Sequence, residues 1–187
     1  MKKLLLITLA FCWLNSFSQI FLSTDGILYQ GDNDYIVLDF PEKDAKTLYK
    51  NALFYINETY KSPKDVIRGD VDAQYLSFST YKEVKLFVKT IDVIMMGADD
   101  SGYIKYNTNL YFKDGRVKLS FSELEIWRKN PNFRYPLNTQ KGVYSIYKKG
   151  DLRNPRVKRR IESAISSTYY KLIIAFEQNG SFDGDDW

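Results

Sequence analysis

The chain has 187 residues, with 27 lysines and arginines, 23 aspartates and glutamates, and no histidine. Its formal charge is +4, and two of these positive charges come from lysines within residues 1–18. This near balance of charge excludes the strongly basic domain typical of nucleic-acid binding. The lack of histidine excludes nucleophilic triads that rely on an imidazole base.

Residues 1–18 have the pattern of a secretory signal peptide. Two lysines precede an almost unbroken apolar run over residues 4–14, which is shorter than the roughly 20 apolar residues of a membrane-spanning helix. Ser16 and Ser18 supply the small residues of a cleavage site. We therefore expect cleavage after Ser18 and a periplasmic or secreted protein with no transmembrane segment. The alternative for this segment is a buried N-terminal helix.

The only cysteine, Cys12, lies within this leader. It follows the bulky Phe11, which argues against a lipid-anchored cysteine. Cleavage would leave a mature chain with neither cysteine nor histidine, which excludes disulfides, cysteine nucleophiles and zinc sites built from these ligands. We expect no cofactor and no metal, and the stability of the mature chain has to come from a packed core.

The expected organisation is one domain with short flanking segments. After the leader comes a lead-in over residues 19–35, then a single domain over residues 36–178 and an acidic tail over residues 179–187. The domain includes a long connection, residues 128–153, which is rich in asparagine, proline and lysine. Connections this long are often functional.

The first expected elements in chain order are a strand, a helix and two more strands. The apolar run of residues 35–40 predicts a buried strand. Residues 44–60 carry apolar side chains at helical spacing, with Asp44 as the N-cap and Ser62-Pro63 as the stop. Two strands are expected over residues 66–72 and 75–81, and residues 82–102 are ambiguous between further strands and a polar loop at 97–102.

Residues 103–127 give the clearest local signal, a β-hairpin. Asp114-Gly115 predicts a type I′ turn, in which both central residues have positive φ. The apolar alternation changes phase after Phe121, and a bulge at Ser122-Glu123 would restore it. The predicted pairs are Lys113 with Arg116, Phe112 with Val117, Leu110 with Leu119, Thr108 with Phe121, Tyr106 with Leu124, and Ile104 with Ile126.

A second amphipathic helix is expected after a short strand at residues 143–147. Asn154 is its N-cap, Pro155 its first residue and Asn179-Gly180 its stop. Two amphipathic helices need an apolar surface, and the sheet offers one. The economical arrangement is an α+β fold in which both helices pack on one face of a curved antiparallel sheet and the other face stays polar.

Two segments carry a resemblance to a known family. Residues 48–60 (LYKNALFYINETY) and residues 110–116 (LYFKDGR) resemble the helix and the strand–turn of an uncharacterised family of exported proteins from Gram-negative bacteria, a domain of unknown function with a TATA-box-binding-protein-like (TBP-like) fold. Tyr55 stands where the family pattern has tryptophan. The resemblance covers roughly residues 36–126. It implies two helices on the convex side of the sheet and no catalytic residues, and it does not imply DNA binding.

Three patterns of catalytic or metal-binding type have weak support. Ser79 and Lys82 have the S-x-x-K spacing of penicillin-interacting enzymes but lie in a strand pattern without the companion motifs. The acidic stretches at 99–100 and 183–186 lack the spacing of a calcium-binding EF-hand loop. Carboxylate pairs at Asp70/Asp72 and Glu123/Glu125 have the spacing that places both on one strand face, as glycosidases require, although strand edges also carry such pairs for solubility.

Two groups of side chains are candidates for binding. Tyr75, Tyr81 and Tyr111 are predicted on the polar sheet face, where tyrosines suit either an interface or an ordinary exposed strand. Arg156, Arg159 and Arg160 lie at the start of the second helix, where positive charge opposes the helix dipole. They suit an anionic lipid headgroup, a glycan or an acidic partner, or simply a solvated face paired with nearby acids.

The expected function is an exported, non-enzymatic binding or envelope-assembly module. Its partner is a protein, a glycan or a lipid headgroup, held by the open sheet face and residues 128–153. The alternatives are a carboxylate-dependent glycan-acting enzyme that uses the acidic pairs and a purely structural domain.

Overall fold

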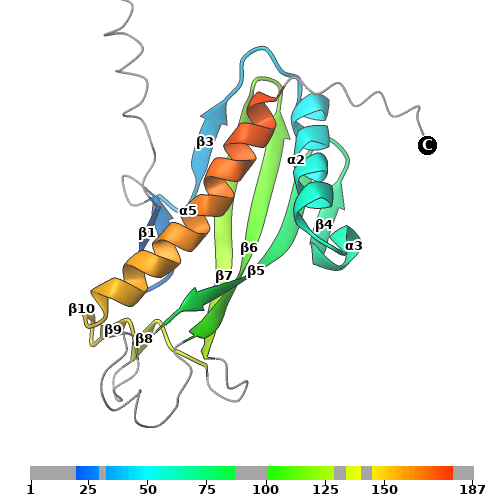
Figure 1. Ribbon diagram of the computed structural model, residues 1–187. Helices are drawn as coiled ribbons and strands as arrows, with labels where there is room; N and C mark the ends of the chain where they lie inside the picture. Colours follow the sequence, from blue (N-terminus) through cyan, green and yellow to red (C-terminus); the bar gives the residue numbers. More distant parts are fainter. Residues whose placement is uncertain (1–19, 30–32, 87–100, 129–133, 140–144, 179–187) are drawn as a thin grey trace, which may run out of the picture.

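The computed structural model describes residues 20–29, 33–86, 101–128, 134–139 and 145–178 (Figure 1). The predicted leader and its cleavage site, the acidic stretches at 99–100 and 183–186, and the helix stop at Asn179-Gly180 lie outside these residues. Among the described helices, none has both the length and the apolar character needed to cross a membrane.

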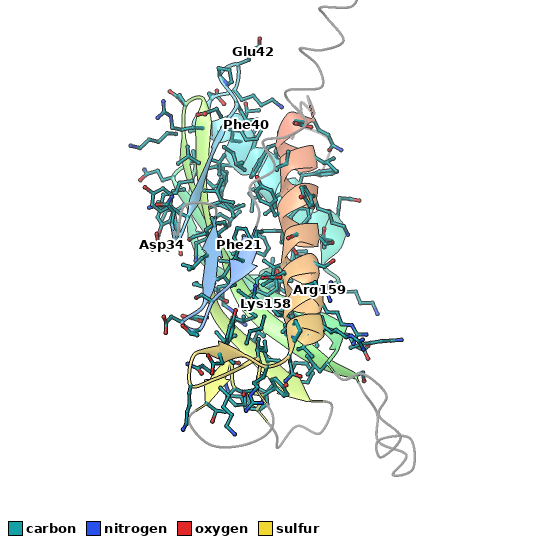
Figure 2. All side chains as sticks on the ribbon, turned by 90° about the vertical axis from the view of Figure 1, so that its left-hand side faces the viewer. Phe21, Asp34, Phe40, Glu42, Lys158 and Arg159 are labelled. Carbon is teal, nitrogen blue, oxygen red and sulfur yellow. The ribbon has the colours of Figure 1, made fainter. Side chains whose placement is uncertain are left out.

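The centre of the fold is a five-stranded antiparallel sheet with helices on one side. Figure 2 shows the sheet edge-on with α5 along one face, as the two amphipathic patterns predicted. The strand order is β3-β7-β6-β5-β4. The strands are β3 (Ile36–Asp39), β4 (Ile67–Val71), β5 (Tyr75–Lys85), β6 (Ser101–Lys113) and β7 (Arg116–Arg128).

The hairpin of β6 and β7 forms in the predicted register. Lys113 pairs with Arg116 across a turn in which Gly115 has φ +78°, a conformation that glycine adopts without a steric penalty. Asp114 does not have a positive φ, so the turn is not the predicted type I′, which needs positive φ at both central residues. The bulge is also present, and Glu123 takes φ +52° in it. Ile104 pairs with Ile126 as predicted, but Tyr106 has no ladder partner on β7, because the extra residue of the bulge lies opposite it.

The turn of this hairpin also positions the first helix, α2 (Ala45–Thr59). The Asp44 side chain accepts a hydrogen bond from Thr47 N at 2.7 Å, as expected of an N-cap. The Asp114 carboxylate accepts a second one from Ala45 N at 2.9 Å. Two carboxylates therefore satisfy the first amides of α2, and one of them ties the helix to the hairpin.

The second long helix, α5 (Pro155–Glu177), packs beside α2 on the same face. The stripe predicted for this helix is buried except for Ala164, which is half-buried, and Tyr169 is added to it; the predicted members are Val157, Ile161, Ala164, Ile165, Thr168, Leu172, Ala175 and Phe176. Tyr106 of β6 and Thr168 of α5 share a buried hydrogen bond of 2.7 Å between their hydroxyl groups, which joins the two layers. Asn154 occupies the cap position, but its side chain donates to Ser145 O and Tyr135 Oη instead of capping the helix.

Three features of the strands differ from the predictions: the burial of one strand and the first residues of two others. The strand predicted over residues 35–40 is half-exposed and not buried, because β3 is an edge strand. Val66 ends the short helix α3 (Pro63–Val66) and does not begin a strand. Ser101 and Gly102 are the first residues of β6, whereas the sequence favoured a loop there.

The lead-in and the long connection both enter the core. The lead-in forms the hairpin β1 (Ile20–Leu22) and β2 (Ile27–Tyr29). The described parts of residues 128–153 form a small sheet of β8 (Asn138–Thr139), β9 (Tyr147–Lys148) and β10 (Asp151–Leu152). Of the predicted strand at 143–147, residues 143 and 144 lie outside the description, and β9 begins at Tyr147.

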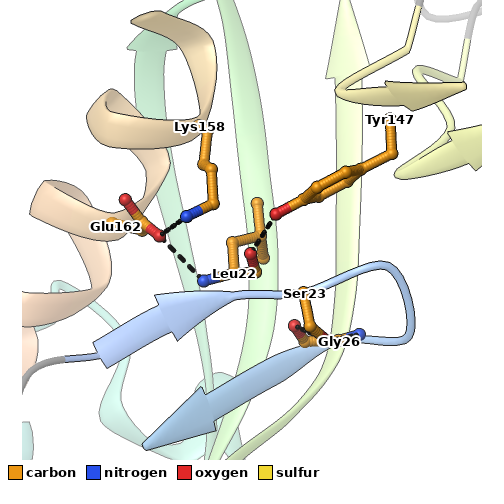
Figure 3. Close-up of polar contacts among 6 residues, drawn as sticks. All are labelled: Leu22, Ser23, Gly26, Tyr147, Lys158 and Glu162. Atoms are coloured by element: carbon orange, nitrogen blue, oxygen red, sulfur yellow. Dashed lines mark hydrogen bonds and ion pairs between the residues drawn. The ribbon is translucent and has the colours of Figure 1, made fainter. Parts of the chain in front are cut away.

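Polar contacts hold these peripheral strands to α5 (Figure 3). Glu162 accepts a hydrogen bond from Leu22 N at 2.9 Å and pairs with Lys158 at 2.8 Å. The hydroxyl of Tyr147 donates to Leu22 O. Leu22 therefore donates its N–H to a side chain of α5 and accepts at its carbonyl oxygen from the long connection, which ties β1 to both.

Candidate functional site

The open face of the sheet carries an exposed row of side chains that crosses all five strands. Each member of the row is the cross-strand partner of the next: Val37 of β3, Lys118 of β7, Tyr111 of β6, Tyr75 of β5 and Val71 of β4. Cross-strand partners on one face contact one another. The row is therefore one continuous surface, which we call the tyrosine row.

The tyrosine row is exposed and hollowed. Val71 is 48% exposed, Tyr111 47% and Val37 45%. Val37 and Val71 lie on the two edge strands, whereas Tyr111 lies on the central strand β6. They line a hollow of about 760 Å³, within the size range of small-molecule sites. The lining is Tyr35, Val37, Val71, Gln74, Tyr75, Tyr111, Phe112, Lys113, Arg116 and Lys118.

Aromatic rings and one ammonium group shape this hollow. The ring centroids of Tyr75 and Tyr111 are 4.8 Å apart, a distance at which aromatic pairs attract. Lys118 Nζ lies 4.0 Å from the ring centroid of Tyr35 and 5.9 Å from that of Tyr111. This ammonium thus makes cation–π contacts with two rings, which hold the rings on either side of it.

The charge of the hollow is one-sided. Its lining includes Lys113, Arg116 and Lys118, while none of the lining residues in the described chain is acidic. A concave surface lined by one sign of charge raises the local concentration of the opposite sign. The site therefore combines flat apolar ring faces with an attraction for anionic groups.

A network of polar side chains lies beside the tyrosine row on the same face. Ser77 donates to Asn109 Oδ1 at 2.8 Å, and Asn109 Nδ2 donates to Ser122 at 2.9 Å. Ser79 donates to Asn107 Oδ1 at 2.7 Å. Both serines are buried by their neighbours even though none of the described helices covers this face. Satisfied networks of this kind hold side chains in one arrangement, so the face is a fixed surface.

A second aromatic cluster ends the open face. The ring centroids of Tyr81 and Tyr103 are 4.5 Å apart, and Tyr103 stacks on Trp127 at 6.3 Å. Trp127 forms an isolated antiparallel β-bridge, through the backbone, with Arg134 of the long connection. Tyr103 and Tyr111 lie eight residues apart on β6, or about 27 Å at strand spacing.

The structure therefore divides the predicted tyrosines between two places. Tyr75 and Tyr111 lie together in the tyrosine row, and Tyr81 belongs to the distant cluster. The strand alternation placed Lys118 on this face, but it did not indicate that Val37 completes the row or that Tyr35 lies beside it. Those two residues reach it only because β3 pairs with β7, and no local pattern encodes that pairing.

With this geometry in view, comparison with known proteins gives a fold. No protein-family model matches the chain, and no curated protein matches it. It is similar to the crystal structure of a DUF4468 family protein from Bacteroides ovatus ATCC 8483, with 12% identity and a TM-score of 0.55 over 79% of this chain and 86% of that chain. It is also similar to a TBP-like protein from Parabacteroides distasonis ATCC 8503, with 8% identity and a TM-score of 0.55 over 77% and 91%. The chain has a TBP-like fold.

The predicted resemblance to uncharacterised TBP-like proteins is thereby confirmed at the level of the fold. In this TBP-like fold the tyrosine row occupies the sheet face that none of the described helices covers. The arginines lie in the other layer, on α5. Arg156 and Arg159 are exposed there, and Arg160 Nη1 donates to Lys85 O at 2.8 Å. The two groups of predicted binding residues therefore belong to separate surfaces.

The acidic pairs have separate environments. Asp70 accepts a hydrogen bond from the Tyr49 hydroxyl at 2.6 Å. The pKa of Tyr49 is raised, mainly by burial and secondly by this carboxylate. Glu123 accepts from Asn107 in the bulge, while Glu125 lies 3.6 Å from Arg134. The bulge between the two glutamates thus alters the simple alternation that would pair them on one face.

The S-x-x-K spacing does not bring its two residues together. Ser79 is on the open face, where it bonds to Asn107 and Arg68. Lys82 is on the helix side, where its Nζ donates to Ala164 O at 2.9 Å. The lysine cannot act as a base for a serine on the opposite face of the strand.

Proposed function

We propose that this protein is a non-enzymatic binding module, acting outside the cytoplasm, whose open sheet face holds an acidic polysaccharide. The tyrosine row carries this proposal, because it is an exposed, hollowed surface that spans every strand of the sheet. A sugar ring presents a flat face of C–H groups, which suits the negative face of an aromatic ring. The cations beside the tyrosines favour sugars that carry carboxylates.

The length of the open face supports a chain ligand rather than a small molecule. The tyrosine row and the Tyr81 cluster are separated by roughly 27 Å, with the fixed serine–asparagine network between them. Arg134, from the long connection, lies beside the second cluster at Trp127. A polysaccharide several residues long can contact both ends, and this is how residues 128–153 take part in the proposed binding.

The experiment measures binding of residues 19–187 to polygalacturonate by isothermal titration calorimetry, with dextran as the neutral comparison. Tyr75→Ala combined with Tyr111→Ala should weaken binding by at least about tenfold, since each aromatic ring contributes on the order of 1 kcal/mol. Tyr170→Ala is the matched control, because Tyr170 is 40% exposed on α5, in the other layer. It should bind as the wild type does.

The outcomes separate the alternatives. Binding that survives the double substitution would remove the open face as the site. Equal binding of a single-stranded oligonucleotide would show a general polyanion surface and contradict the carbohydrate. Capture of a folded protein partner by the same face, with no polysaccharide binding, would favour the assembly role instead.

One observation keeps the enzymatic alternative testable. Glu123 lines a smaller hollow of about 460 Å³ together with Asp25 and Asp34, although neither predicted pair shares that hollow. A carboxylate-dependent glycan-acting enzyme would release reducing ends from a polysaccharide and would lose this activity in Glu123→Gln. No release of reducing ends by the wild type would leave the binding module as the better account.

A further inference from the structure

A basic groove lies between α5 and the end of β5, in the layer opposite the tyrosine row. We call it the α5–β5 groove. It has a volume of about 880 Å³. Figure 2 shows Arg159, one of its residues, on the N-terminal half of α5. The lining is Lys82, Glu83, Val84, Lys85, Arg156, Arg159, Arg160, Ser163, Ala164, Ser167 and Lys171.

The groove concentrates positive charge. Its lining has six cationic side chains and one carboxylate, Glu83, whereas the whole chain has a formal charge of only +4. None of Lys82, Arg156, Arg159 or Lys171 forms an ion pair with a carboxylate of the described residues. By contrast, Lys158 on the same helix is paired with Glu162 at 2.8 Å. These four cations repel one another, and Glu83 is the one carboxylate among the lining residues.

Lys82 forms the floor of the groove. It is half-buried, and among the described residues its ammonium has one hydrogen-bond acceptor, Ala164 O at 2.9 Å, although an ammonium carries three donors. Burial, together with the nearby Lys171, lowers the pKa of Lys82 to about 8. A charge held where the protein itself disfavours it gains more than an exposed one from a bound anion.

The three arginines indicate which kind of anion fits. A guanidinium presents a planar fork of donors that matches the oxygens of a phosphate. Arg156, Arg159, Ser163 and Ser167 follow one another on the outward side of α5, so their donors line the groove along the helix. The first turn of α5 holds no acidic residue, and the helix dipole there also favours an anion.

We propose that the α5–β5 groove binds phosphate groups, with arginines at its rim and Lys82 at its floor. Phosphates reach such a groove either as free polyphosphate or as lipid headgroups. This site is independent of the tyrosine row, and each can be disrupted without the other.

The first measurement is calorimetric binding of pyrophosphate at constant ionic strength to residues 19–187. Arg156→Gln combined with Arg159→Gln should weaken binding by at least about tenfold, because hydrogen bonds to charged groups contribute more than neutral ones. The matched control is Lys46→Gln combined with Lys50→Gln, which removes the same charge from exposed positions on α2. The control should bind within a factor of about two of the wild type.

A second arm identifies the source of the phosphate. Vesicles of phosphatidylglycerol and phosphatidylcholine are sedimented with the protein, and vesicles of phosphatidylcholine alone serve as the comparison. Binding to the anionic vesicles that is lost in the arginine variant assigns the groove to lipid headgroups. Pyrophosphate binding without vesicle binding assigns it to free phosphate.

Lys82→Met gives a readout that surface charge alone would not move. It removes the floor of the groove but leaves the exposed arginines, and it should weaken pyrophosphate binding while circular dichroism shows an unchanged fold. The proposal is overturned if neither pyrophosphate nor anionic vesicles bind. It is equally overturned if the α2 control weakens binding as much as the arginine variant does.

Discussion

Lys82 offers the sharpest test of the energetics of this fold. It lies on the helix side of β5 and donates to Ala164 O, with Lys171 nearby. Burial and the second ammonium lower the pKa of Lys82 from 10.5 to about 8. Below pH 8 the folded protein therefore holds a proton that the unfolded chain binds more tightly. Lys82→Met keeps the length of the side chain and removes that charge.

The size of the effect follows from the shift in pKa. One pKa unit corresponds to about 1.4 kcal/mol, which sets an upper bound of roughly 3.4 kcal/mol for a fully buried group. Lys82 is only half-buried, so solvent screening reduces the cost to about 1–2 kcal/mol. The lost hydrogen bond to Ala164 O offsets up to about 1 kcal/mol. At pH 7 we expect Lys82→Met to be as stable as the wild type or up to about 2 kcal/mol more stable.

The dependence on pH has a definite sign. Between pH 8 and 10.5 the folded state has released the Lys82 proton while the unfolded state still holds it, so the stability of the wild type rises relative to Lys82→Met across this window. Urea unfolding followed by tryptophan fluorescence at pH 7, 8, 9 and 10 measures the difference. The difference in unfolding free energy between the wild type and Lys82→Met cancels the contribution of the buried tyrosines, which titrate in both proteins.

An exposed lysine gives the control for this measurement. Lys50→Met on α2 removes an ammonium from an exposed position and is measured at the same pH values for comparison. A difference between wild type and Lys82→Met that stays constant from pH 7 to pH 10 would refute the reasoning. Direct titration of the Lys82 ammonium by NMR should give a midpoint near 8.

Three further substitutions test the packing. Gly102→Ala places a Cβ 2.4 Å from Trp127 O, and the shift this forces should cost about 1–3 kcal/mol in urea unfolding. Gly115→Ala puts a side chain at φ +78° and should lower the thermal midpoint, with a cost of roughly 1–2 kcal/mol; an unchanged midpoint would contradict the turn assignment. Tyr106→Phe removes the 2.7 Å hydrogen bond to the Thr168 hydroxyl but leaves Tyr55 as a hydrogen-bonding neighbour of that hydroxyl. Urea unfolding should therefore show a loss of about 0.5–1.5 kcal/mol.

Local chemistry accounts for most of the secondary structure. The register of β6 and β7 follows from the turn at Asp114-Gly115, because the dihedral angles of two residues align the strands on either side. The bulge follows from the phase change after Phe121, since alternation has a period of two. The cap of α2 follows from Asp44 and the amide of Thr47, three residues away. Each of these signals lies within a few residues of the structure that it predicts.

The candidate surfaces depend on contacts between distant parts of the chain. Alternation places Tyr75 and Tyr111 on one sheet face, but the row is complete only when β3 pairs with β7 and brings Val37 beside Lys118. Likewise, helical spacing groups the arginines, whereas Lys82 joins them only because α5 packs against β5. These pairings maximise the burial of apolar surface by the whole chain, a global quantity that is not encoded in any short segment. The sequence alone thus determines the stripes of the two long helices, the alternation of side chains along the central strands and the register of one hairpin, and only the packing of the layers decides which of those side chains form a site.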